Sequence, residues 1–148
     1  MKTEILANDY HCSITANVTA KEAFDRINNV TGWWAKNFEG QSQKTGDIFT
    51  VRFGETFVTF KITEAIANKK IVWQVTDCYI PKLSDKTEWN GTSVVWEISS
   101  DKNSTTVEMT HIGLVPGIEC FAMCENGWNR HVKGSLLNLL TENKGQPS

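Results

Sequence analysis

The residue best placed to do chemistry is His111, which falls on the apolar face of a segment with strand-like alternation. Val107, Met109 and His111 alternate with polar residues, so the imidazole is expected to point into the protein interior. A buried imidazole needs partners, because an unpaired polar group in the interior is costly. Two roles are open. His111 is either an anchor or general acid/base for a bound molecule, or a structural histidine bonded to the backbone or to the region of Trp128.

Aromatic and apolar residues on the inward faces of the expected elements form a second candidate group. Flat rings commonly line small-molecule pockets, and they also fill protein cores. Trp128 lies where a long helix would leave space, and Trp33 and Trp34 suit a gate at a cavity mouth. Together with His111, the candidate ligand-binding residues are Trp33, Trp34, Phe60, Trp73, Trp96, Met109, Phe121, Trp128 and Val132.

Thiol and imidazole groups recur near the end of the chain. Cys120, Cys124 and His131 fall at positions i, i+4 and i+11 of one segment. Zinc favours four tetrahedrally placed ligands, and this spacing is not that of the short loop-borne zinc motifs. A nucleophilic pair of Cys124 with His111 has no supporting local signature. We therefore expect neither a metal site nor a cofactor.

Four charged residues lie within segments that otherwise resemble strands. They are Arg52, Lys61, Glu64 and Glu97. A buried arginine can choose a carboxylate head group by a bidentate contact. The alternative is that all four belong to the solvated face of the sheet.

Length and charge limit the classes of protein and partner. A chain of 148 residues matches a single domain, and its 40% hydrophobic and 22% charged residues are typical of a folded globular protein. Fifteen basic and seventeen acidic residues give a net charge of -2, without a basic run that would neutralise several phosphates. We expect one domain over residues 1–142, a disordered tail over 143–148, and no nucleic-acid partner.

The N-terminal segment has only a short apolar stretch, Ile5 to Ala7, before polar residues return. This is too short for the apolar region of a signal peptide or for a membrane span. The four cysteines have no CxxC pair, which is typical of reduced, buried thiols. The sequence therefore predicts a cytoplasmic protein without a membrane span.

The first half of the chain predicts a strand, two short helices and then a run of strands. Residues 10–16 alternate between apolar and polar, and Thr19 with Glu22 forms a capping box that begins a short helix. A second brief helical turn carries Trp33 and Trp34. Further strands are expected around residues 49–53, 58–62, 71–76, 94–98 and 107–111, giving about six strands in all.

The last predicted element is a long amphipathic helix over residues 118–141. Phe121, Cys124, Trp128 and Val132 recur at spacings of three and four, and a helix of this length spans about 35 Å. Interior glycines at 127 and 134 predict a close backbone approach or a gentle bend. Strands gathered ahead of a terminal helix indicate an α+β domain, a curved antiparallel sheet wrapped around that helix.

Several segments resemble a known family. They are Trp89-Asn90-Gly91-Thr92, residues 94–98, residues 106–114, Gly127-Trp128 and Gly134-Ser135-Leu136. These residues resemble the C-terminal half of the family named for the activator of the heat-shock protein 90 ATPase. That family belongs to the SRPBCC superfamily, with the START-like and birch-pollen-allergen-like domains. The resemblance implies the helix-grip fold.

Members of that superfamily share a cavity between sheet and helix and include lipid and sterol carriers, hormone receptors, cyclases and aromatases. The resemblance therefore implies binding of an apolar small molecule, such as a lipid, a sterol-like compound or an aromatic metabolite. One alternative is a cyclase or hydratase that uses His111 as proton carrier. Another is a protein-interaction module with a chaperone contact or a weak homodimer contact.

Overall fold

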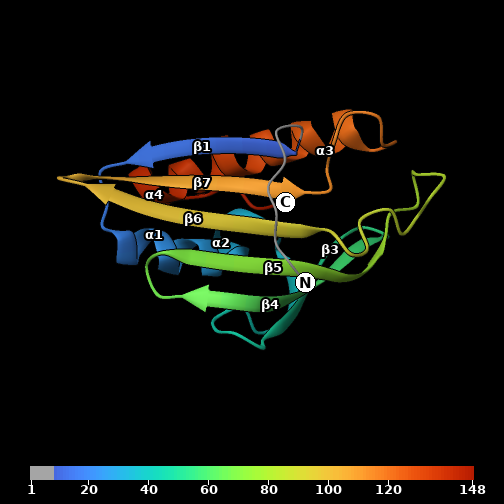
Figure 1. Cartoon of the computed structure of the whole chain (residues 1–148), viewed down its shortest axis with the longest axis horizontal. Coiled ribbons are helices and arrows are strands. Elements are labelled where there is room, and N and C mark those ends of the chain that lie inside the picture. Colours follow the sequence, from blue (N-terminus) through green and yellow to red (C-terminus); the bar gives the residue numbers. More distant parts are fainter. Residues whose placement is uncertain (1–8) are drawn as a thin grey trace.

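The computed structural model describes residues 9–148, so the N-terminal stretch that suggested a cytoplasmic protein lies outside the described residues. Seven strands form one antiparallel sheet, in the order β1-β7-β6-β5-β4-β3-β2 (Figure 1). The elements in chain order are β1 Tyr10–Ala16, α1 Ala20–Asn28, α2 Val30–Trp33, β2 Asn37–Gly40, β3 Ile48–Phe53, β4 Thr56–Ile66, β5 Lys70–Tyr79, β6 Ser93–Asp101, β7 Ser104–Ile112, α3 Phe121–Trp128, the π-helical segment η1 Asn129–Leu136 and α4 Leu137–Glu142.

The first strand and the capping box form as the alternation predicts. In β1 every second residue from Tyr10 to Ala16 is buried, and the strand pairs with β7 over its whole length. The Thr19 hydroxyl accepts a hydrogen bond from the Glu22 amide at 3.0 Å and so caps α1. Helices α1 and α2 are the two short helices expected after strand one.

The sheet has seven strands where the sequence predicted about six. The additional strand is β2, which pairs with β3 at the sheet edge. It contains one apolar residue, Phe38, and ends at Gly40. Four residues with a single apolar side chain give no alternation to detect, so the strand is defined by its neighbour β3.

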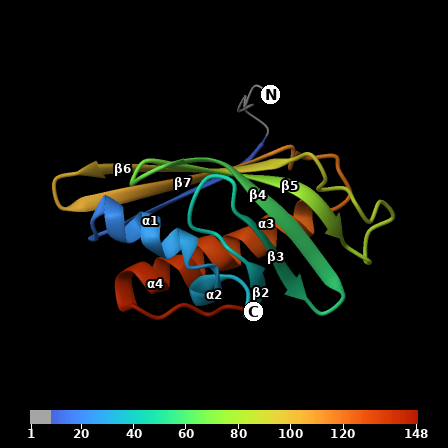
Figure 2. The same cartoon turned by 90° about the horizontal axis from the view of Figure 1, so that it is seen from below.

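Irregular pairing between β4 and β5 interrupts the sheet at two places. The register shifts between Thr59 and Phe60 and again between Ile62 and Glu64. Such bulges bend a strand and increase its twist, so they favour a sheet that curves around a helix. The helices lie together on one side of this sheet (Figure 2).

The C-terminal helix is continuous through α3, η1 and α4, but it begins at Phe121 and not at residue 118. Ile118 belongs to a turn that follows Gly117, whose φ of 106° suits glycine. Of the two expectations for Gly127 and Gly134, the close backbone approach is wrong, because a Cβ at either position would meet no atom beyond its own helix backbone within 4 Å. The middle of the helix is instead widened into the π-helical segment.

The centre of the interface between sheet and helices is filled by aromatic side chains. Trp33, Trp73 and Trp96 are fully buried, and the ring centroid of Trp96 lies 5.5 Å from Trp33 and 5.3 Å from Trp73. Phe49 and Phe60 pack against Trp73 at 5.1 Å and 5.4 Å. In the part of the chain that the structure describes, these rings therefore fill the centre of the interface between sheet and helices.

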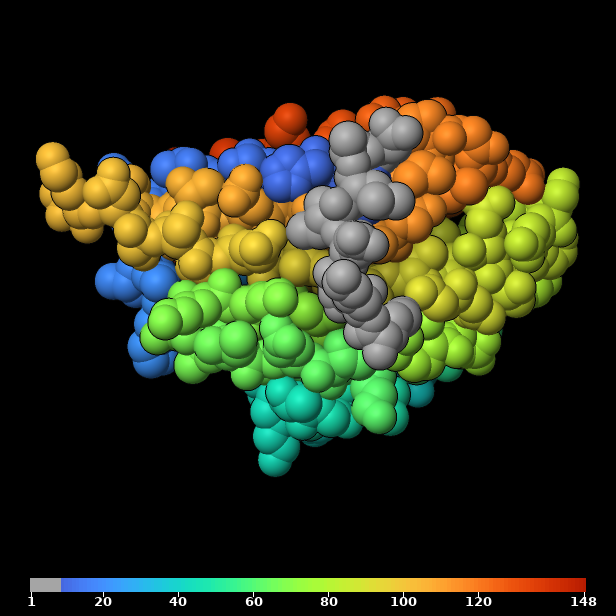
Figure 3. Space-filling view, viewed as in Figure 1, coloured from blue at the N-terminus to red at the C-terminus, as the bar shows by residue number. Residues whose placement is uncertain are grey.

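The opposite face of the sheet is turned toward the viewer in Figure 3 and has polar side chains along β1 and β7. On this face His11 pairs with Thr110 at 2.9 Å, and the hydroxyls of Thr15 and Thr106 lie 3.0 Å apart. Glu108 approaches the His11 ring at 3.5 Å. The sheet therefore has one apolar face covered by helices and an opposite face that has polar contacts along β1 and β7 and also carries the buried Val72 and Val95.

Residues 143–148, for which the sequence predicts a disordered tail, lie against the helices in the structure. The Ser148 amide donates to the Trp34 carbonyl, and the Lys36 amide donates to the Ser148 carbonyl, each at 2.9 Å. The Gln146 amide donates to the Ser135 hydroxyl at 2.6 Å. These contacts hold the tail beside α2. They could not be predicted from the sequence, because residues 143–148 have no hydrophobic periodicity.

Candidate functional site

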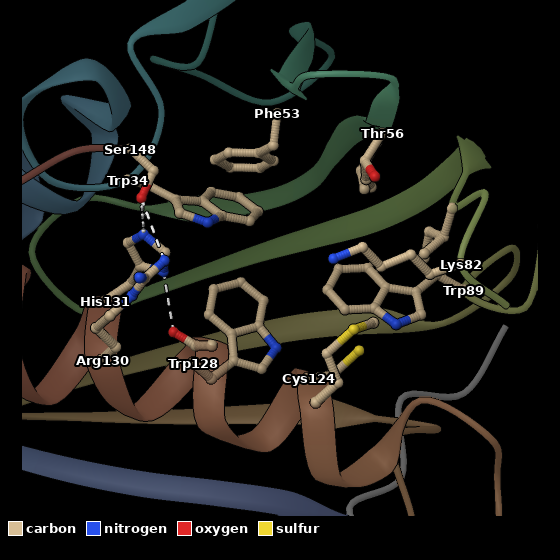
Figure 4. A pocket seen from close by; sticks show the side chains of 14 residues that line it. Trp34, Phe53, Thr56, Lys82, Trp89, Cys124, Trp128, Arg130, His131 and Ser148 are labelled. Carbon is tan, nitrogen blue, oxygen red and sulfur yellow. Dashed lines mark hydrogen bonds between the residues drawn. The ribbon is translucent and has the colours of Figure 1, made fainter.

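A pocket of about 420 Å³ opens between one end of the sheet and the C-terminal helix (Figure 4). The end of β3 and the start of β4 supply one wall, the β5–β6 loop supplies the second, and α3 with η1 supplies the third. The lining residues are Trp34, Phe53, Thr56, Val58, Ile80, Lys82, Trp89, Met123, Cys124, Gly127, Trp128, Arg130, His131 and Ser148. Its volume falls within the range of about 300 to 1,000 Å³ that is usual for small-molecule sites.

Aromatic rings surround the pocket. The ring centroid of Trp34 lies 4.8 Å from that of Trp128 and 5.8 Å from that of Phe53. Trp89 stacks against Trp128 with centroids 6.0 Å apart and planes inclined by 12°. The three indoles are at least nine-tenths buried, so the rings are held in place by packing and present fixed apolar faces.

The helical wall of the pocket is formed by residues at helical spacing. Cys124, Gly127, Trp128 and His131 follow one another at intervals of three, one and three, which places them on one face of the helix. Gly127 has no side chain, and a Cβ there would meet open space. The absence of a side chain at Gly127 therefore leaves room between Trp128 and the neighbouring walls.

His111 is fully buried behind this pocket and does not line it. Trp128 Nε1 donates to His111 Nδ1 at 3.0 Å, so the other nitrogen, Nε2, carries the proton of the neutral ring. Nε2 then donates to the Thr92 hydroxyl at 2.9 Å, and that hydroxyl donates to the Trp89 carbonyl at 2.7 Å. The chain of hydrogen bonds ties β7 to both Trp89 and Trp128.

Burial also keeps the His111 ring neutral. Desolvation lowers its pKa from 6.5 to about 3. Protonation at Nδ1 would in addition turn the acceptor of the Trp128 N–H into a donor. The geometry favours the structural role of His111, because both ring nitrogens are occupied and neither faces the pocket.

A second histidine, His131, does line the pocket. Its Nδ1 donates to the Gly127 carbonyl at 2.9 Å, and its Nε2 accepts from the Ser148 hydroxyl at the same distance. Arg130 Nη2 also donates to the Ser148 hydroxyl, at 3.3 Å. Burial lowers the pKa of His131, although its hydrogen bond to Gly127 acts in the opposite direction. Arg130, His131 and Ser148 form the polar corner of the pocket (Figure 4).

The thiol at the pocket wall is part of a pair. A hydrogen bond between the Cys120 and Cys124 side chains raises the pKa of Cys120 and lowers the pKa of Cys124. Trp89 Nε1 donates to Cys120 Sγ at 3.2 Å. Within residues 9–148 no three His, Cys, Asp or Glu side chains gather as metal ligands. Cys124 lines the pocket, whereas Cys120 is fully buried and does not line it.

Two of the ten predicted site residues, Trp34 and Trp128, line the pocket. Phe121 is partly buried against the core and does not line the pocket. The other seven are fully buried core residues: Trp33, Phe60, Trp73, Trp96, Met109, His111 and Val132. Alternation correctly placed these side chains inside, but it does not distinguish a filled core from the wall of a pocket.

Most of the other residues that line the pocket have no pattern in the sequence that would select them. Lys82 and Trp89 come from the β5–β6 loop, which has no periodic pattern. Phe53 stands next to the β3–β4 turn and shares the apolar pattern of its strand. Arg130 lies in η1 and is exposed, so hydrophobic spacing does not select it. A signal that was available is Gly127, since a glycine inside a helix marks missing side-chain volume.

The charged residues within strands do not enter the pocket. Arg52 Nε donates to Glu39 at 2.7 Å, and Lys70 pairs with Glu64 at 3.0 Å. Lys61 and Glu97 are exposed. All four candidates, Arg52, Lys61, Glu64 and Glu97, are absent from the pocket lining, which agrees with the solvated alternative.

Solved structures with the same architecture identify the fold. The Aha1 dimer from Colwellia psychrerythraea aligns with a TM-score of 0.77 and 22% identity over 93% of this chain and 98% of that chain. A protein from Staphylococcus saprophyticus aligns with a TM-score of 0.70 and 14% identity, covering 93% and 95%. The chain has the helix-grip fold. No protein-family model and no curated protein matches it.

The helix-grip fold also occurs in a putative protein of the dynemicin biosynthetic locus. That structure aligns with a TM-score of 0.71 and 16% identity, and the match covers 95% of this chain but 49% of that chain. At such identities the comparison establishes the arrangement of sheet and helix and leaves the ligand open. Among the described residues, no helix is long and apolar enough to cross a membrane.

Proposed function

We propose that this protein binds a small apolar molecule with a flat ring system in the pocket between the sheet end and the C-terminal helix. The observation that carries the proposal is the placement of three of the six tryptophans, Trp34, Trp89 and Trp128, around one unfilled space. Rigid indoles offer large apolar contact area at little cost in side-chain entropy. The pocket volume of about 420 Å³ suits a ligand of two or three fused or linked rings.

The buried hydrogen bonds behind the pocket support a binding role. His111 fixes Trp128 through one ring nitrogen and reaches the Trp89 carbonyl through Thr92. Two walls of the pocket are thereby positioned before a ligand arrives, which reduces the entropic cost of binding. In this proposal His111 positions the binding surface and does not touch the ligand.

The cyclase or hydratase alternative has less support from the geometry. Its proton carrier, His111, is separated from the pocket by the indoles and has a pKa lowered to about 3. His131 lines the pocket, but its two nitrogens are bound to the Gly127 carbonyl and the Ser148 hydroxyl. A general acid or base needs a ring nitrogen within hydrogen-bond reach of the reacting group.

The proposal is tested by filling the pocket. Gly127→Leu places a side chain on the pocket-facing side of α3, in a position where a Cβ meets no other atom. Gly134→Leu is the matched control, because Gly134 lies on the same helix, is equally unobstructed and does not line the pocket. Leucine is a better helix former than glycine, so both variants are expected to fold.

The probe is the uncharged dye N-phenyl-1-naphthylamine, whose fluorescence increases in apolar surroundings. We expect Gly127→Leu to bind the dye about tenfold more weakly than the wild-type protein does. A side chain that crowds a binding site costs about 1–3 kcal/mol. Gly134→Leu should bind as the wild type does. Equal dye affinity in all three proteins, or no binding to the wild type, would refute the proposed site.

A further inference from the structure

The charged side chains that line the pocket have one sign. Among its lining residues are two permanent cations, Lys82 and Arg130, and no aspartate or glutamate. The whole chain has the opposite balance, with seventeen acidic and fifteen basic residues. A cleft with apolar walls and charges of one sign concentrates the field on its opening, because the walls screen poorly.

Neither pocket cation is neutralised by a carboxylate within the described part of the chain. The ion pairs of the structure involve Lys21, Arg52, Lys70 and His11, and none of these residues lines the pocket. The described side-chain contact of Arg130 is to the uncharged hydroxyl of Ser148. The two cations are therefore available to an anion that enters the pocket.

The cations approach the rings from different walls. Lys82 comes from the β5–β6 loop, and in Figure 4 its side chain points inward beside Trp89. Arg130 comes from η1 and reaches Ser148 in the polar corner. The Ser148 hydroxyl, which accepts from Arg130, occupies the place that an acidic oxygen of a ligand can take.

We propose that the pocket selects flat aromatic molecules that have one acidic group, a carboxylate or a sulfonate. The rings lie among Trp34, Trp89 and Trp128, and the acidic group takes the guanidinium of Arg130, with Lys82 as the second positive charge. Guanidinium groups bind carboxylates through paired N–H donors, which fixes orientation as well as sign. This inference rests on the proposed function, since the rings must first enter the pocket.

Two dyes that differ in one group separate the inference from the proposed function. 8-Anilinonaphthalene-1-sulfonate has the ring system of N-phenyl-1-naphthylamine with an added sulfonate. We expect the wild-type protein to bind the sulfonate dye about tenfold more tightly than the uncharged dye in low salt, and the difference to shrink as ionic strength rises. The sulfonate dye should also be displaced by 2-naphthoate and much less by 2-naphthol.

Variants assign the effect to the named residues. Lys82→Met with Arg130→Met removes both charges and keeps most of the side-chain length, and Lys133→Met removes an exposed charge of the same helix outside the pocket. In the double variant the ratio of sulfonate-dye affinity to uncharged-dye affinity should fall about tenfold, whatever small change the two substitutions cause in binding of the uncharged dye. Lys133→Met should leave both affinities unchanged.

The possible failures are distinguishable. If the uncharged dye does not bind the wild-type protein, the proposed function fails and the inference fails with it. If the uncharged dye binds but the sulfonate dye binds no more tightly, only the selection of an acidic group is wrong. If Lys133→Met weakens sulfonate binding as much as the double variant does, the attraction is a property of the whole surface and not of the pocket.

Discussion

Replacing His111 by glutamine is expected to make the protein markedly less sensitive to acid. His111 stays neutral in the folded state because burial lowers its pKa to about 3, whereas in the unfolded chain the imidazole has its ordinary pKa of 6.5. Below pH 6.5 the unfolded chain therefore takes up a proton that the folded protein excludes. Stability from this residue is fully present above pH 6.5 and is lost as the pH falls toward 3.

The size of the effect follows from the difference in pKa. Each pH unit between 6.5 and 3 costs about 1.4 kcal/mol for one proton, so a change from pH 7.5 to pH 4.5 removes about 3 kcal/mol. Glutamine does not titrate, yet its amide oxygen can accept from Trp128 Nε1 and its amide nitrogen can donate to Thr92 Oγ1. We therefore expect His111→Gln to cost about 1 kcal/mol at pH 7.5 and to be nearly as stable as the wild type, or more stable, at pH 4.5.

Urea unfolding followed by tryptophan fluorescence at both pH values measures the free energies directly. For each protein, the decrease in the free energy of unfolding between pH 7.5 and pH 4.5 is determined. The decrease in His111→Gln is then subtracted from that in the wild type, because the other histidines and the carboxylates contribute equally to both. His11→Gln, on the exposed outer face, is the control and should keep the acid sensitivity that His111 causes. If wild type and His111→Gln lose the same stability on acidification, His111 titrates normally and its place in the buried network is wrong.

Two further outcomes follow from the same contacts. Thr92→Val should lower the free energy of unfolding by about 1–3 kcal/mol, because it leaves the buried His111 Nε2–H without an acceptor. Thr15→Val, at an exposed position of β1, is the control and should change the free energy of unfolding by less than about 0.5 kcal/mol. Iodoacetamide should modify Cys124 before Cys12, Cys78 or Cys120 in the native protein, since Cys124 lines the pocket and its hydrogen bond with Cys120 lowers its pKa, and N-phenyl-1-naphthylamine should slow that reaction. Peptide mass spectrometry measures the modification rate of each cysteine. If the dye leaves the rate at Cys124 unchanged, the dye does not bind in the pocket.

Periodicity predicted most of the fold because it records which side of an element is buried. The alternation around Ile14 predicted a strand with one apolar face, and the spacing of Trp128 and Val132 predicted an inward-facing helix. Phe38 belongs to a strand too short to show a period. The spacing of residues 129–136 is that of an ordinary amphipathic helix, so the π-helical segment from Asn129 to Leu136 was not predictable from the sequence pattern.

The candidate site was harder to predict than the fold, since a pocket is volume that side chains fail to fill. Trp73 and Trp96 have the same inward pattern as Trp34, yet they pack against each other at 5.3 Å and close the centre of the sheet. Whether an inward tryptophan closes a core or borders a hollow depends on its neighbours across the sheet. For His111 the sequence left two roles open, one of them bonding to the region of Trp128, and the fold decides between them by bringing Trp128, seventeen residues away, onto Nδ1.

The position of the pocket follows from the sizes of the side chains along the helix. Where the indoles of Trp33, Trp73 and Trp96 meet, no space remains, whereas toward the start of the helix the pocket-facing positions include Cys124 and Gly127, which are small. The opening therefore faces the β3–β4 turn and the β5–β6 loop. Loops tolerate substitution better than the strands they connect. A helix-grip domain can thus keep its buried centre while substitutions in the β5–β6 loop, which carries Lys82 and Trp89, change the shape and charge of the pocket.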